Sequence, residues 1–260
     1  MKNRNNIRIW LLAASLLLVT ALPARATSFD LLTINYSGDS QYSSYFAQAE
    51  SRWEGVISGY KVDKGQTGIT INASVSAIDG PGKILGQAGV TYIWAPPTLT
   101  APYLYASQGV MTFDSADISG LGASLYDVIL HEMAHVIGFG TLWDVSYNGS
   151  IYNDVLNNSG QYIGANALEA YQAEFDQLAA YVPVEMSGGV GTAGGHWDED
   201  EMGAELMTGW LDYPTFLSNT TRMSFVDIGY EVTPVPEPGT LLLLGTGLFG
   251  LLAAGRRRRE

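Results

Sequence analysis

Residues 125–138, LYDVILHEMAHVIG, decide how the rest of the chain is interpreted. Apolar residues recur at helical spacing through this stretch, and a glycine ends it, so we predict a helix from Leu125 to Ile137 that stops at Gly138. Ser124 and Asp127 predict a start resembling a capping box. The helix is apolar on its back, where we expect it to pack into a core.

The front of this predicted helix carries His131 and His135. Two histidines four residues apart stand one turn above each other on the same face, which is the spacing that a single metal ion requires. Glu132 lies roughly 100° round from His131, where its carboxylate can reach a water on that metal. The alternative is a solvated helix face with two stray histidines. Because the chain has only 3 histidines, that coincidence is disfavoured.

The third ligand has to come from elsewhere in the chain. A catalytic zinc takes three protein ligands and a water, and the remaining histidine is His196. A downstream carboxylate, Glu169 or Glu174, is the competing third ligand. The acidic residues 198–201 beside His196 are a solvated loop or a candidate calcium site.

Both ends of the chain are typical of targeting segments. Basic residues and the apolar run 9–22, followed by an A-x-A cleavage site, predict a signal peptide over residues 1–26. At the other end, residues 233–260 hold a short apolar segment and then the arginines 256–259, which predict a transmembrane segment with its arginine end in the cytoplasm. The domain between them, residues 27–232, is therefore expected outside the cytoplasm.

Composition narrows the classes of function for this domain. The chain has no cysteine, which excludes cysteine zinc sites and thiol nucleophiles. With both ends set aside, few cations face most of the 26 carboxylates, so nucleic acid is disfavoured as a partner. The cations left are Arg52, Lys61, Lys64, Lys83 and Arg222.

The pattern of the whole domain predicts a mixed α+β fold. We expect two lobes, about 27–140 and 141–232, with the metal in the cleft between them; the second lobe is irregular and glycine-rich. The predicted strands are 29–35, 68–78, 90–94 and 110–114, and the other predicted helices are 44–57 and 165–181.

Several segments resemble the leishmanolysin family of metzincins, and the resemblance covers roughly residues 44–232. They are HEMAHVIGFG (131–140), YVPVEMSGGVGTAGGHW (181–197), ELMT (205–208) and SFVDIGYEV (224–232). The resemblance implies a twisted mixed sheet with the active-site helix in the first lobe and a long insertion before the third histidine. It also implies that Met207 forms a Met-turn beneath the imidazoles. Independently of the resemblance, Gly138 and Gly140 supply the backbone freedom for a sharp turn after the helix. The cysteines common in eukaryotic members are missing.

The tail is similar to the PEP-CTERM sorting signal of Gram-negative bacteria. The sequence VPEP at 235–238, the short apolar segment and the terminal arginines carry this resemblance. It implies recognition by sorting machinery, cleavage near the motif, and a place at the cell surface or outside the cell. A plain membrane anchor, which would keep the tail, is the alternative.

Together these features predict an exported zinc endopeptidase that acts on protein or peptide substrates. Zinc would activate a water and Glu132 would be the general base. The rival is a surface or extracellular-matrix protein with a structural or vestigial metal site. Glu132 argues against the rival, because a structural site has no use for a base beside its ligands.

Overall fold

The computed structural model describes residues 29–62, 65–94, 102–157 and 159–234. The predicted signal peptide lies outside these residues, as does the predicted tail apart from residues 233–234. Within the described ranges, no helix is both long and apolar enough to cross a membrane.

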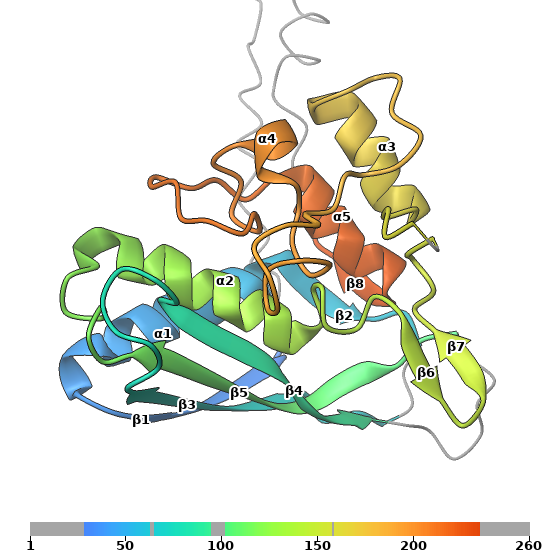
Figure 1. Ribbon diagram of the computed structural model, residues 1–260. Helices are drawn as coiled ribbons and strands as arrows, with labels where there is room; N and C mark the ends of the chain where they lie inside the picture. Colours follow the sequence, from blue (N-terminus) through green and yellow to red (C-terminus); the bar gives the residue numbers. More distant parts are fainter. Residues whose placement is uncertain (1–28, 63–64, 95–101, 158, 235–260) are drawn as a thin grey trace, which may run out of the picture.

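A twisted mixed sheet of four strands forms the base of the molecule (Figure 1). Its order is β1-β3-β5-β4, and only the pairing of β4 with β5 is antiparallel. This places β4 at the edge of the sheet, next to α2. The strands are β1 Leu32–Ser37, β3 Ile69–Ser76, β4 Gly86–Trp94 and β5 Tyr105–Asp114.

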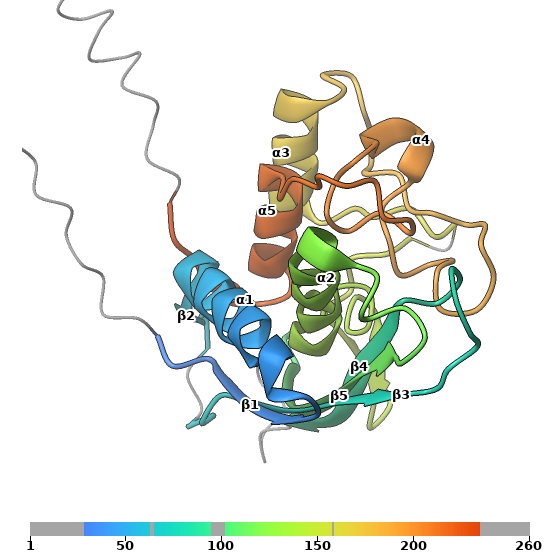
Figure 2. The same ribbon diagram turned by 90° about the vertical axis from the view of Figure 1, so that its left-hand side faces the viewer.

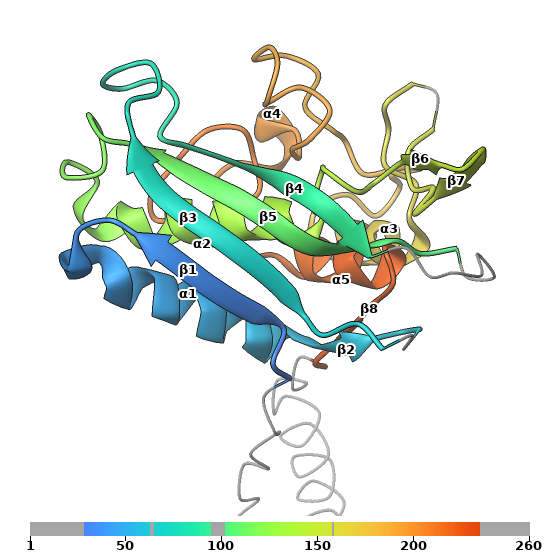
Figure 3. The same cartoon turned by 90° about the horizontal axis from the view of Figure 1, so that it is seen from below.

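Two helices, α1 (Ser43–Val56) and α2 (Leu125–Ile137), lie side by side on one face of the sheet (Figures 2 and 3). Trp53 of α1 is fully buried and donates from Nε1 to the carbonyl of Leu130 at 2.9 Å, which ties the two helices together. On β5, a Cβ at Gly109 would overlap the side chain of Val136, so this glycine lets α2 approach the sheet closely. The predicted helix 125–137 is confirmed.

The second half of the chain lies on the α2 side of the sheet and is mostly loops (Figure 1). An aromatic cluster of Phe139, Trp143, Tyr162 and Trp197 packs together there. Its elements are α3 Ala165–Glu174, α4 Glu199–Met202 and α5 Asn219–Asp227, the hairpin of β6 Val145–Tyr147 and β7 Ser150–Tyr152, and β8 Tyr230–Val232, which pairs with β2 Ile57–Tyr60 of the first half. The first half also holds the short 3-10 helices η1 Ser40–Tyr42 and η2 Gly122–Ser124.

One predicted cap and one predicted helix boundary are wrong for local reasons. The capping box at Ser124 does not form, although α2 starts at Leu125 as predicted, because η2 runs directly into α2 and the Ser124 hydroxyl donates to the Leu121 carbonyl instead. The helix predicted over 165–181 ends at Glu174, where the side chain of Asp176 accepts from Leu178 N in a turn. Most of residues 187–230 is irregular as predicted, but α4 and α5 were missed there.

Candidate metal centre

Three imidazoles converge on one point. The Nε2 atoms of His131, His135 and His196 are each 3.0 Å from the other two. Ligand atoms of a tetrahedral zinc at its usual bond length to nitrogen are about 3.3 Å apart, so the triangle fits such an ion. In the described part of the chain, this is the one group of three or more His, Cys, Asp or Glu side chains that lie close enough together to hold a metal.

The contacts of the Nδ1 atoms show that the three Nε2 atoms present lone pairs to one another. Each Nδ1 contacts a backbone carbonyl, which can only accept, so each Nδ1 carries the ring proton. The carbonyls are those of Leu206 for His131 (2.7 Å), Phe139 for His135 (2.9 Å) and Thr192 for His196 (2.9 Å). A neutral imidazole has one such proton, so all three Nε2 atoms face one another unprotonated. A cation is the group that satisfies them.

Burial favours this neutral state. It lowers the pKa of all three histidines, and the neighbouring imidazoles lower the pKa of His131 and His135 further. A metal needs neutral imidazole ligands, so the site is prepared for one before the metal arrives.

Two glycines at the end of α2 bring the third histidine to the first two. Gly138 ends the helix with a φ of 135°, after which the Phe139 carbonyl turns back to His135. Gly140 has a φ of 68°, and a Cβ there would overlap the backbone oxygen of Gly195. The chain beside His196 therefore rests directly on the turn after α2.

His196 is presented by a loop that closes on itself. Glu185 N donates to the His196 carbonyl at 2.9 Å, and Gly194 N donates to the Glu185 carbonyl at 2.7 Å. The neighbouring Trp197 forms a bridge with Val184. These bonds fix the third histidine without a regular element.

Glu132 lies in the same cleft as the histidines, with 6% of its surface exposed. Within the described residues, no hydrogen bond to its carboxylate is seen. A Cβ at Gly86, the first residue of β4, would come within 2.9 Å of its Oε1, so the edge strand passes directly beside it. Burial raises the pKa of Glu132 to about 8.

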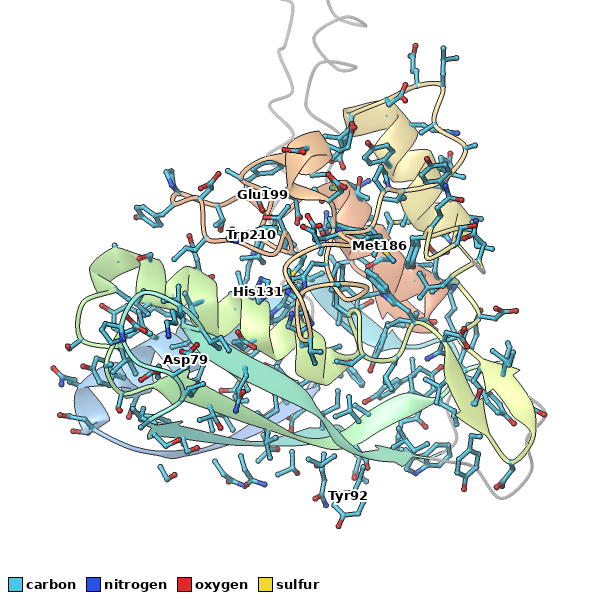
Figure 4. All side chains as sticks on the ribbon, viewed as in Figure 1. Asp79, Tyr92, His131, Met186, Glu199 and Trp210 are labelled. Carbon is cyan, nitrogen blue, oxygen red and sulfur yellow. The ribbon has the colours of Figure 1, made fainter. Side chains whose placement is uncertain are left out.

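The cleft has a volume of about 710 Å³ and runs between β4 and the loops of the second half. In Figure 4, His131 lies on α2, below the loops that carry Met186 and Trp210. The side chains of Ile84, Val190 and Trp210 line the cleft and are exposed. Charged side chains in the lining are Lys83, Asp127 and Glu132.

The competing ligands predicted from the sequence have other positions. Glu174 accepts hydrogen bonds from the backbone of Asn219 and Thr220, and Glu169 is exposed on α3. In the acidic run, Asp198 caps α4 and Glu199 accepts from Trp210 N. Neither carboxylate from α3 joins the histidine cluster, and no second cluster forms at residues 198–201 in the described structure.

Met207 is fully buried, directly after Leu206, whose carbonyl holds His131. Sequence reasoning missed the roles of Leu206 and Gly86. A backbone carbonyl has no sequence signature, and Gly86 acts through a close approach that only the fold provides. For Leu206, the segment ELMT (205–208) was the one available signal.

Comparison with known families agrees with a metal site at the three histidines. The family model described as Leishmanolysin, a peptidase family, matches residues 88–235, more than half of the chain. The chain belongs to the leishmanolysin family. Leishmanolysin-type enzymes are metallopeptidases, and the matched region contains the whole histidine cluster.

A second match covers the tail of this leishmanolysin-family chain. Residues 234–259 match the PEP-CTERM protein-sorting motif, which indicates an exported protein with a C-terminal sorting signal. No curated protein matches the chain.

Proposed function

We propose that the chain is a zinc-dependent endopeptidase that cleaves protein or peptide substrates outside the cytoplasm. His131, His135 and His196 would hold one zinc, with Met207 as an apolar residue beneath them. The observation that carries the proposal is the convergence of three Nε2 atoms in a cleft that also holds a buried carboxylate.

The chemistry divides between the metal and Glu132. Bound zinc supplies a Lewis acid that polarises the scissile carbonyl and lowers the pKa of water to about 7. Glu132 takes a proton from the attacking water and passes it to the nitrogen of the leaving amine. A raised pKa, near the working pH, suits a group that must both accept and release a proton.

The edge strand β4 offers a place for an extended peptide. Residues 84–88 line the cleft, and no strand pairs with the free side of β4 in the described sheet. Backbone groups at such an edge hydrogen-bond to an added strand. A substrate laid along β4 passes Gly86, and hence the Glu132 carboxylate.

The ends of the chain belong to the same proposal. Residues 1–26 are a signal peptide, residues 27–232 the peptidase with lobes of about 27–140 and 141–232, and residues 233–260 a sorting tail with a short transmembrane segment. The sorting machinery cleaves the tail near its motif, and the protein reaches the cell surface or the medium.

Glu132→Gln separates the chemistry from the fold. The substitution is nearly isosteric and leaves all three imidazoles, so we expect one zinc per chain, as in the wild type. Hydrolysis of casein should fall by about 10²–10⁴-fold, the range for general acid–base catalysis. His196→Ala is the companion variant and should lose the zinc.

Metal analysis and the casein assay on the same preparations distinguish a zinc endopeptidase from a surface-matrix protein with a structural metal. Full activity in Glu132→Gln would reject Glu132 as the base. A wild-type protein that holds zinc but cleaves nothing would favour a surface-matrix protein with a structural metal. Stoichiometric zinc in His196→Ala would reject the third ligand.

A further inference from the structure

A buried carboxylate lies behind the metal centre. Glu205 has 1% of its surface exposed, and no cation pairs with it in the described residues. Its Oε2 accepts from Met207 N at 2.5 Å. Its Oε1 accepts from Ser218 N (3.0 Å), Ser218 Oγ (2.8 Å) and Thr221 Oγ1 (2.6 Å).

The hydrogen bonds around Glu205 stabilise its ionised form. Each carboxylate oxygen accepts from a backbone N–H, which can only donate, so these contacts are made to the carboxylate and not to an acid proton. Burial holds the pKa of Glu205 above its ordinary value, and the hydrogen bonds from Thr221, Met207 and Ser218 limit the rise.

A single peptide group joins Glu205 to His131. The N–H of Met207 and the carbonyl of Leu206 belong to the same peptide unit. The N–H donates to Glu205, and the carbonyl accepts from His131 Nδ1 at 2.7 Å. Hydrogen bonds in series polarise one another, so a negative charge at one end of the peptide strengthens the bond at the other.

The carbonyls that hold the other two histidines have no such support in the described chain. The N–H that follows Thr192 in its peptide belongs to Ala193 and donates to the neutral carbonyl of Gly189 at 3.0 Å. For Phe139, whose carbonyl holds His135, no carboxylate accepts from the N–H of Gly140. His131 is thus the histidine whose carbonyl partner is polarised by a charge.

A second branch reaches the loop of His196. Thr221 Oγ1, which donates to Glu205, accepts from Trp197 Nε1 at 2.8 Å. Trp197 N donates to the Met207 carbonyl at 3.0 Å. The same carboxylate therefore fixes the Met207 turn from which both sides of the site are held.

We propose that Glu205 is a positioning residue for the metal centre, which acts on His131 through the 206–207 peptide group. It orients the imidazole and makes Nε2 a stronger electron donor, as a carboxylate hydrogen-bonded directly to a metal-binding histidine does. The inference rests on the zinc site of the proposed function, but it concerns metal affinity and does not depend on peptidase activity.

Glu205→Gln removes the charge and keeps the shape. We expect its zinc affinity, measured by competition with a chelating dye, to fall by about 10–100-fold, as for other groups that support metal ligands. Ser218→Ala is the matched control, because it cuts the same buried network and the cap of α5 but leaves the bond between Met207 N and Oε2. Its zinc affinity should stay close to that of the wild type even where its melting temperature falls.

Nuclear magnetic resonance of the histidine rings tests the route. In the zinc-loaded protein, the Nδ1 proton of His131 should resonate furthest downfield of the three. In Glu205→Gln it should move upfield by more than the protons of His135 and His196. A purely structural role would move all three to a similar extent, or none. The wild-type comparison needs no variant, so it holds even if Glu205→Gln does not fold.

The outcomes keep this inference apart from the proposed function. Unchanged zinc affinity in Glu205→Gln, or a His131 proton that resembles the other two, would overturn the role of Glu205 while leaving the peptidase intact. A wild-type protein that binds zinc without cleaving peptides would reject the peptidase and leave the role of Glu205 to be judged on zinc affinity. A wild-type protein that binds no zinc would overturn both.

Discussion

Burial shifts the pKa values of Glu132 and its neighbour His131 in opposite directions. Burial lowers the pKa of the imidazole and raises that of the carboxyl, so both groups are driven toward their neutral forms in the metal-free protein. For the histidine, neutrality is the state in which it binds a metal. For Glu132, it places the titration near neutral pH, where a group can accept a proton and return it.

The raised pKa of Glu132 predicts a pH-dependent difference in stability. A carboxyl whose pKa is higher in the folded state, at about 8, binds more protons when folded, so the free energy of unfolding falls as pH rises from about 4.5 to 8. The amide of Glu132→Gln cannot titrate in this range. The metal-free variant should therefore match the wild type in melting temperature near pH 5 and exceed it above pH 8. A constant difference between the two proteins across this range would contradict the shift.

Gly140 predicts a sensitive point for His196. A side chain there is disfavoured by its φ of 68° and would meet the Gly195 backbone. Gly140→Ala should displace the chain beside His196, and we expect a fall of at least tenfold in zinc affinity, because small shifts of ligands are costly. Gly195→Ala is the matched control, since a Cβ at Gly195 has no atom within 4 Å. Equal affinities in the two variants would show that this contact does not position His196.

The three histidines and Glu132 could be proposed as site residues from the sequence, because binding of one metal by a helix requires a particular spacing of its ligands. The spacing His131–His135 requires a helix, and the shortage of histidine leaves His196 as the remaining imidazole. The acceptors of the Nδ1 protons could not be found this way. They are carbonyls of Leu206, Phe139 and Thr192, and any residue type supplies a carbonyl.

At the scale of elements, α3 and α5 cap each other. Asp227, at the end of α5, accepts from Asn166 N and Ala167 N at the start of α3 (both 2.9 Å). Glu174, at the end of α3, accepts from Asn219 N and Thr220 N at the start of α5 (both 2.8 Å). A carboxylate at a helix N-terminus satisfies free N–H groups and favours the helix dipole.

This exchange of caps predicts the cost of Asp227→Asn. The amide keeps the shape but loses the charge and one acceptor, so we expect the free energy of unfolding to fall by about 0.5–2 kcal/mol, the range for a lost cap. Glu169→Gln, on the exposed surface of α3, is the control and should change it little. Chemical denaturation of the zinc-loaded proteins measures both. Equal stability of the two variants would mean that the caps do not matter.

The same exchange of caps helps to explain why one helix could not be predicted from the sequence while others could. Strands and helices with regular apolar periodicity, such as α1 and α2, were predicted within a few residues. The helix α5 was missed, because its mostly polar sequence NTTRMSFVD has little periodicity. It is stabilised by Ser218 at its own start and by Glu174 from another helix, and the second of these contacts spans more than 40 residues of sequence.

At the scale of the molecule, the histidine cluster joins the two halves of the chain. His131 and His135 come from the helix packed on the sheet, whereas His196 comes from the irregular half, which has few regular elements of its own. A metal bound to all three would crosslink a well-packed layer to a loop-rich one. The cleft beside it would then be the part of the fold that depends most on the metal.

Removal of zinc should accordingly destabilise the whole protein and loosen one half more than the other. A ligand at about a thousandfold excess over its Kd stabilises the native state by roughly 4 kcal/mol, or roughly 10 °C in melting temperature for a chain of this size. Chelation should lower the melting temperature by that order, and hydrogen exchange should speed up most in residues 185–210, with β3 and β5 little changed. Glu132→Gln should show the same dependence on zinc, because it keeps all three imidazoles, and His196→Ala should show almost none. Uniform loss of protection across the sheet and the loops would contradict a metal that mainly fastens the second half to α2.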